Sequence, residues 1–215
     1  MFVALGATPR RFPENGTSPM TTDLSDQSTA EVRYAYKASL IGAAHQFELR
    51  DDGLSWQVGG KSGVWPYADI AAIRLSYRPV SMQSRRFRAD IESINRQRIA
   101  ILSTSWQTVA LMAPQDRDYR AFVTQLHRRM RDAGSRAALI GGIGPKTYAA
   151  GIVLLALVGI AISGLFVRAT ATGEFSGALF LVGFAVLFGW QIGGFIRRNR
   201  PRTYTFDDLP QALLP

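Results

Sequence analysis

TYAAGIVLLALVGIAISGLFV, residues Thr147–Val167, is followed after seven residues by FSGALFLVGFAVLFGWQIGGFI, residues Phe175–Ile196. Neither stretch contains a charged side chain. A helix of either length extends about 30 Å, which is the thickness of the hydrocarbon core of a bilayer. Buried helices of a water-soluble core usually keep a polar face, and these stretches have none. We therefore predict a transmembrane helical hairpin at 147–196, with the connecting turn at 168–174.

Basic residues flank the outer ends of the hairpin and are scarce in its turn, which has one arginine and one glutamate. The flanking residues are Arg128, Arg129, Arg131, Arg136 and Lys146 before the first span, and Arg197, Arg198, Arg200 and Arg202 after the second. Short loops rich in Lys and Arg stay on the cytoplasmic side. A two-pass protein with both termini in the cytoplasm is the prediction. The absence of cysteine agrees with a reducing compartment.

The remaining sequence has room for one domain of ordinary size. Residues 1–30 are rich in Ser, Thr, Pro and Gly, which predicts a disordered segment. Within it, Met20 precedes a polar stretch, and we expect translation to start at Met20 instead of Met1. The folded domain is expected at 31–133, a linker at 134–146 and a cytoplasmic tail at 197–215.

Apolar residues alternate with polar ones through most of the expected domain, which is typical of half-buried strands. Phe47 and Leu49, then an Asp51-Asp52-Gly53 turn, then a second alternating run predict a β-hairpin. The other expected strands are Val32–Leu40, Val64–Tyr67 with Pro66 at an edge or bulge, a run around Ile73, Leu75 and Tyr77, a run around Phe87, Ala89 and Ile91, Arg98–Leu102, and Thr108–Met112.

The period changes after Pro114. Tyr119, Phe122, Val123, Leu126 and Met130 follow helical spacing, with acidic residues in the first turn and Gly134 beyond the last. Such a stripe indicates a helix that packs on a core. The predicted fold class is α+β: about seven antiparallel strands closed by one C-terminal helix, and then the transmembrane hairpin.

This order of elements resembles the pleckstrin-homology-like (PH-like) barrel. The stretch GVWPYADIAAIRLSY, Gly63–Tyr77, is similar to a strand pair of the bacterial PH-like, YcxB-like membrane proteins. The resemblance covers Val32–Met130 and implies a domain joined to a bacterial inner membrane, although many relatives place their hairpin first. Phosphoinositide-binding PH domains use basic residues in the first hairpin loop, whereas Arg50-Asp51-Asp52-Gly53 is acidic at its tip. That lipid site is therefore not expected here.

The sequence shows no grouping of catalytic or metal-binding residues. His45 and His127 stand apart, and we expect His127 to be solvated or to cap the helix. The GGKSG stretch at Gly59–Gly63 lacks the spacing of a phosphate-binding P-loop and predicts a flexible turn. Adjacent carboxylates at 51–52 and 207–208 lack a partner base. The expectation is a protein that is no enzyme and that holds no cofactor or metal.

The candidate binding residues are Arg85, Arg86 and Arg88, with Arg96 and Arg98 across the expected hairpin. Such a strand face is either solvated surface or a contact for anionic lipid headgroups or an acidic protein partner. Nucleic acid is not an expected partner, because exposed aromatic side chains for base stacking are missing from the cluster.

Small residues recur within the two spans. Those at helical spacing are Gly151, Gly159 and Ser163 in the first span, and Ala185, Gly189 and Gly193 in the second. Small residues let helices approach closely, so these stripes are expected to pack on each other or on a second copy in a homo-oligomer. Gln191 is the polar side chain at depth, and we expect it to form an interhelical hydrogen bond.

These observations predict a membrane-anchored cytoplasmic binding or scaffolding module. The alternative is a small accessory subunit of a transporter or envelope complex, in which the hairpin contacts the functional partner.

Overall fold

The computed structural model describes residues 32–79, 85–108 and 111–215. Its first sheet is antiparallel, in the order β1-β2-β3-β4. The strands are β1 Val32–Tyr36, β2 His45–Leu49, β3 Leu54–Val58 and β4 Lys61–Trp65. The predicted hairpin around Gly53 is confirmed as β2 and β3. Gly53 has φ +154°, and a Cβ there would lie 2.2 Å from the Trp65 carbonyl oxygen, so glycine is required.

A second sheet contains five strands in the order β11-β10-β5-β6-β7. Its strands are β5 Ile70–Tyr77, β6 Phe87–Ser93, β7 Arg98–Leu102, β10 Ala138–Gly141 and β11 Arg202–Thr203. The expectation of purely antiparallel pairing is wrong at one place, because β10 runs parallel to β5. A small sheet pairs β8 Thr104–Trp106 with β9 Met112–Pro114, and two short 3-10 helices are η1 Tyr67–Asp69 and η2 Gln211–Leu213.

Several expected strand bounds change. The first strand ends at Tyr36 instead of Leu40. The edge strand β4 begins at Lys61 and ends at Trp65, and Pro66 follows it and precedes η1. The strand expected at 108–112 is displaced to β9, while positions 109–110 lie outside the described residues. The expectations for residues 1–30, including a start at Met20, also concern residues outside the described part of the chain.

Two tyrosines join the sheets where β1 meets β7. The Tyr34 hydroxyl donates to the Leu102 carbonyl oxygen and the Tyr36 hydroxyl donates to the Ala100 carbonyl oxygen, each at 2.6 Å. β7 is the last strand of its sheet, so these hydroxyls satisfy acceptors that no further strand pairs.

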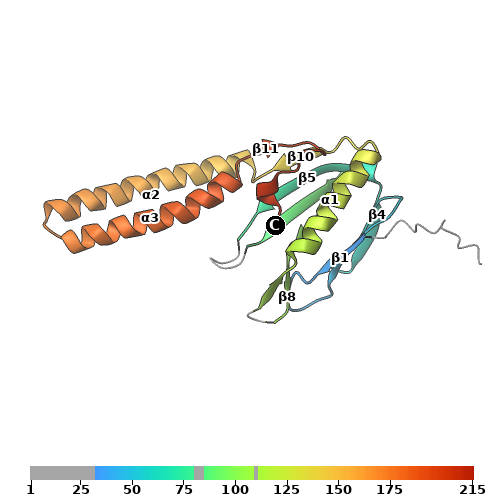
Figure 1. The fold of residues 1–215 in the computed structure, drawn as a ribbon, viewed down its shortest axis with the longest axis horizontal. Coiled ribbons are helices and arrows are strands. Elements are labelled where there is room, and N and C mark those ends of the chain that lie inside the picture. The colour runs from blue at the N-terminus through green and yellow to red at the C-terminus, as the bar shows by residue number, and fades with distance from the viewer. Residues whose placement is uncertain (1–31, 80–84, 109–110) are drawn as a thin grey trace, which may run out of the picture. The chain divides into compact units, whose positions relative to one another are not determined.

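The predicted amphipathic helix is α1, Asp116–Asp132. Figure 1 shows α1 packed across the strands. All five residues of its predicted stripe are buried, and they meet Phe47, Ile73 and Ile91 in one continuous core. The helical period therefore identified the core face of α1 correctly.

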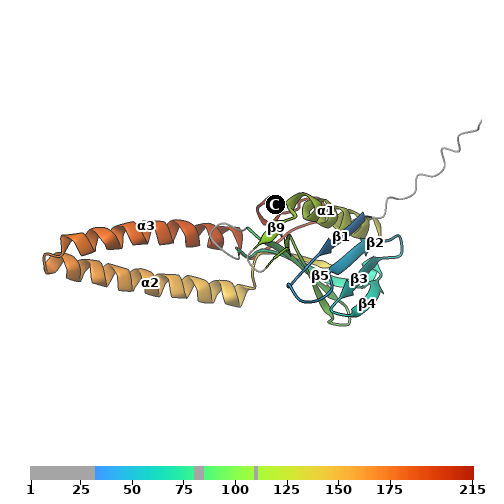
Figure 2. The ribbon, with the colours of Figure 1, turned by 90° about the horizontal axis from the view of Figure 1, so that it is seen from below.

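The two apolar stretches form α2, Pro145–Ala171, and α3, Phe175–Arg198. They lie side by side in both ribbon views (Figures 1 and 2). Both helices are long and apolar enough to cross a membrane, and the most apolar part of each is unburied within the structure. This exposure is unlike the core helices of water-soluble proteins, which are mostly buried.

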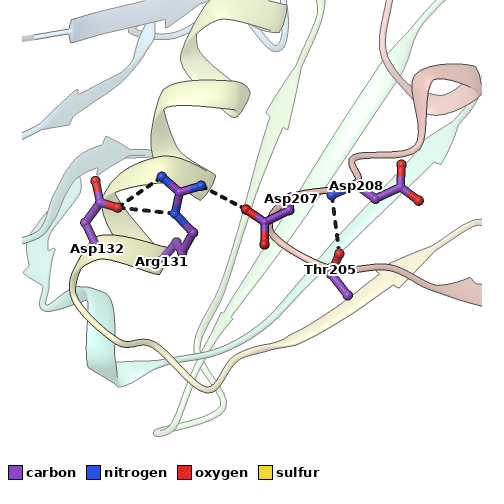
Figure 3. A network of polar contacts seen from close by, with 5 residues as sticks. All are labelled: Arg131, Asp132, Thr205, Asp207 and Asp208. Carbon is purple, nitrogen blue, oxygen red and sulfur yellow. Dashed lines mark hydrogen bonds and ion pairs between the residues drawn. The ribbon is translucent and has the colours of Figure 1, made fainter.

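The expected linker and tail are instead parts of the sheet domain. β10 lies within 134–146, and β11 pairs with it antiparallel after the hairpin. Leu213 and Leu214 are buried in the domain core, at 0% and 5% exposure. Figure 3 shows the tail tied to α1, where Arg131 bonds Asp207 at 2.9 Å. The helical hairpin is therefore an insertion between the neighbouring strands β10 and β11. The buried leucines that complete the core follow the hairpin in the chain.

The junction between the hairpin and the sheet is hydrogen-bonded. Asn199, the residue after α3, is fully buried; its side-chain amide accepts from the Tyr77 N–H at 3.0 Å and donates to the Tyr77 carbonyl at 2.8 Å. The Ile143 N–H donates to the Asn199 carbonyl at 3.1 Å. Gly142, just before Ile143, has φ +86°, and a Cβ there would lie 2.4 Å from the Asn199 carbonyl oxygen.

Candidate functional site

The predicted basic cluster lies on β6 and the residues just before it. Phe87, Ala89 and Ile91 are buried, which confirms that they point into the core. Arg86 and Arg88 alternate with them and therefore lie on the opposite face of the sheet. Arg85 is exposed before the strand begins.

The arginines of this cluster differ in their partners. The Arg88 guanidinium donates to one oxygen of Asp90, at 2.7 Å from Nε and 2.5 Å from Nη2. Arg86 is half-buried, and its buried Nε has no hydrogen-bond partner among the described residues. Burial lowers the pKa of Arg86, and the positive charges of Arg88 and Arg78 lower it further. Arg88 is thus compensated by its neighbour, whereas Arg86 is left with excess positive charge.

Strand β5 adds arginines that sequence reasoning missed. Arg74 lies opposite Asp90, and Ser76 lies opposite Arg88. The Arg78 N–H donates to the Arg86 carbonyl at 2.8 Å, which continues this pairing beyond the strands and sets two arginines opposite each other. Like charges in such positions destabilise a sheet. The alternation Arg74, Ser76, Arg78 was a signal in the sequence that these side chains share a face.

Of the two basic residues expected across the hairpin, Arg98 lies opposite Glu92 and shares the face of Arg88, whereas Arg96 lies in the turn between the strands. Arg98 pairs with Glu92 at 3.0 Å, and Arg96 occupies the turn with φ +60°. We define the basic face as Arg74, Arg78, Arg86 and Arg88, with Arg85 at its border just before β6. Two acidic side chains share this face, Asp90 paired with Arg88 and Glu92 paired with Arg98.

A groove lies between the hairpin and a part of the sheet domain that includes Tyr77, Pro79 and Arg85. Its volume is about 760 Å³, and its walls include Arg85 from the sheet domain and Arg197 and Arg198 from the end of α3. The Arg198 guanidinium lies 5.0 Å from the centre of the Tyr77 ring, at a distance that permits a cation–π contact. Arginines distant in sequence therefore border one apolar space.

The small-residue stripes are not used for close packing within the hairpin. A Cβ placed at Gly151, Gly159, Gly189 or Gly193 would meet nothing within 4 Å. Ser163 donates to the Gly159 carbonyl of its own helix at 2.8 Å. Packing of these stripes, which include Ala185, against a second copy stays a prediction.

Gln191 is exposed and lines the groove. Among the described residues it has no hydrogen bond, so the expected interhelical bond is not formed within this chain.

The expectation that His127 is solvated or caps the helix is wrong. It is 1% exposed, and its Nδ1 lies 2.7 Å from the Val123 carbonyl while its Nε2 lies 2.9 Å from the Tyr204 hydroxyl. A carbonyl only accepts, so Nδ1 carries the proton and Nε2 accepts from Tyr204. Burial lowers the pKa of His127. His45 begins β2, with its Nδ1 3.1 Å from the Tyr36 hydroxyl oxygen.

The remaining motifs have structural roles. Gly59 and Gly60 form a turn with positive φ, and the rest of GGKSG belongs to β4. Of the two acidic pairs, Asp51 lies 3.4 Å from Arg129, and Asp207 is bound by Arg131. Within the described residues, no group of three or more His, Asp or Glu side chains is arranged to hold a metal ion.

Comparison of the chain with protein-family models, curated proteins and solved structures finds no match. The resemblance to PH-like barrels therefore stays a prediction.

Proposed function

We propose that this protein is a membrane-anchored binding or scaffolding module without enzymatic activity. In this proposal α2 and α3 cross a bacterial inner membrane, both chain ends lie in the cytoplasm, and the basic face contacts anionic headgroups. The PH-like character of the domain belongs to the same proposal.

The observation that carries the proposal is the position of Arg85. It borders the same groove as Arg197 and Arg198, which end the second apolar helix. Basic residues at the end of a membrane span lie at the depth of the headgroups. The junction at Asn199 therefore holds Arg85, at the border of the basic face, near that depth without a flexible tether.

The expected strength of this contact is modest. A basic residue near an anionic surface contributes about 1 kcal/mol, and the effect fades within a Debye length of roughly 8 Å. The paired Arg88 contributes less than Arg85. The basic face can thus orient the domain, while the hairpin anchors it.

The test uses a hairpin-excised chain, in which a short Gly-Ser turn replaces residues 144–198. The hydrogen bond between Ile143 and Asn199 shows that the two ends lie next to each other, so β10 and β11 can still pair. We expect this soluble chain to bind phosphatidylglycerol vesicles weakly, with binding that falls steeply as salt rises. Changing Arg85, Arg86 and Arg88 to Ser is expected to abolish sedimentation with the vesicles.

A matched control changes Arg117, Arg128 and Arg136 to Ser, which removes the same charge from exposed positions on and after α1. Circular dichroism checks that each variant is folded, and the single variant Arg85→Ser avoids the half-buried positions. Equal loss of binding in the control would reduce the effect to net charge and refute a role for the basic face.

A second candidate function is contact with a membrane partner through the hairpin, as in an accessory subunit. The open space beside Gly159 and Gly189 favours it, because their backbones are accessible to another helix. Site-specific crosslinking from α2 and α3 in the full chain would identify such a partner, and crosslinks to lipid alone would count against it.

A further inference from the structure

The groove at the base of the hairpin combines two kinds of wall. Apolar side chains from both helices form one part, including Leu154, Leu155, Val158 and Phe188. The arginines Arg85, Arg197 and Arg198 border the same space. An occupant that matches both parts needs an acyl chain and an anionic group.

We propose that this groove holds one anionic phospholipid, with its phosphate at the three arginines and an acyl chain along the apolar wall. This inference rests on the proposed insertion of the hairpin into a membrane. It goes further than a diffuse contact with the basic face, because it assigns one lipid to one defined site. Basic pockets beside transmembrane helices are known to favour anionic headgroups.

The arrangement of Arg198 supports a formed site. Its guanidinium lies over Tyr77, whose backbone N–H and carbonyl are both bonded by the buried Asn199 amide. A cation held in this way loses less conformational freedom when an anion binds. Arg85 lines the same groove.

The test uses the full chain in phosphatidylcholine vesicles that contain a small fraction of brominated phosphatidylglycerol. Trp190 lines the groove, is 81% exposed and is the tryptophan of the hairpin, so bromine on a bound acyl chain will quench it. The difference from Trp190→Phe isolates its emission. We expect quenching to show about a tenfold preference for brominated phosphatidylglycerol over brominated phosphatidylcholine.

Arg197→Gln and Arg198→Gln are each expected to lower this preference severalfold. The matched control is Arg168→Gln, because Arg168 lies at the opposite end of the hairpin and should leave the preference unchanged. Equal quenching by the two lipids in the parent would overturn the proposal, as would a preference that survives in both groove variants.

The two proposals fail separately. The hairpin-excised chain lacks the groove, so its vesicle binding reports on the basic face alone. Lipid preference at Trp190 without vesicle binding by the excised chain would support the groove and reject the surface contact, and the reverse result would reject the groove.

Discussion

Replacing Leu213 with alanine tests whether the C-terminal segment is part of the domain core. Leu213 is 0% exposed, and its Cδ1 would lie 3.1 Å from a Cβ built on Gly141, so it packs directly against β10. Truncating a buried leucine costs about 2–5 kcal/mol, because the cavity left behind collapses only partly. A loss of about 3 kcal/mol is a large share of the stability of an ordinary domain.

The assay is urea unfolding of the full chain in a mild detergent, followed by tryptophan fluorescence, to which Trp56 and Trp65 in the first sheet contribute. With a denaturant slope of about 2 kcal/mol per molar, the midpoint should fall by about 1.5 M. Ala212→Ser, at an exposed neighbouring position, should change stability by less than about 0.5 kcal/mol. A Leu213→Ala midpoint equal to that control would show that the tail is not part of the core.

Three further outcomes are expected. Burial lowers the pKa of His127 in the folded state below the unfolded value of 6.5. The stability contributed by neutral His127 is therefore present above pH 6.5 and is lost as pH falls toward the folded-state pKa. His127→Gln should reduce the difference between the urea midpoints at pH 7.5 and 5.5. Gly142→Ala should destabilise the junction by more than about 1 kcal/mol, because a Cβ would clash with backbone at positive φ, and a midpoint equal to the parent would contradict this. Reporter fusions after Arg136 and Pro215 should read cytoplasmic and one near Thr170 should read outside, and a periplasmic C-terminus would refute the topology.

The elements found from sequence are those with a long local pattern. The two long apolar helices needed only length and the absence of charge, and the apolar residues of α1 repeat over about three turns. The hairpin at Gly53 was marked by an acidic turn between two alternating runs. In each case the signal lies within the segment itself.

The elements that were missed depend on partners distant in the chain. β10 has four residues and pairs with β5 more than sixty positions earlier, and Leu213 is buried by contacts that no local period predicts. Likewise, Arg85 was identified in its strand, but its place beside Arg197 and Arg198 follows from the tertiary fold.

The insertion of the hairpin between β10 and β11 sets an order for assembly of the chain. β11 and the buried leucines are synthesised after both apolar helices, so the sheet cannot be completed before α3 has left the ribosome. The antiparallel return of α3 brings Asn199 back beside Ile143, so a formed hairpin lowers the entropy cost of bringing β10 and β11 together. Under the proposed membrane topology, insertion of the hairpin and completion of the domain are coupled steps of biogenesis, because the last strand and the buried leucines follow the hairpin in the chain.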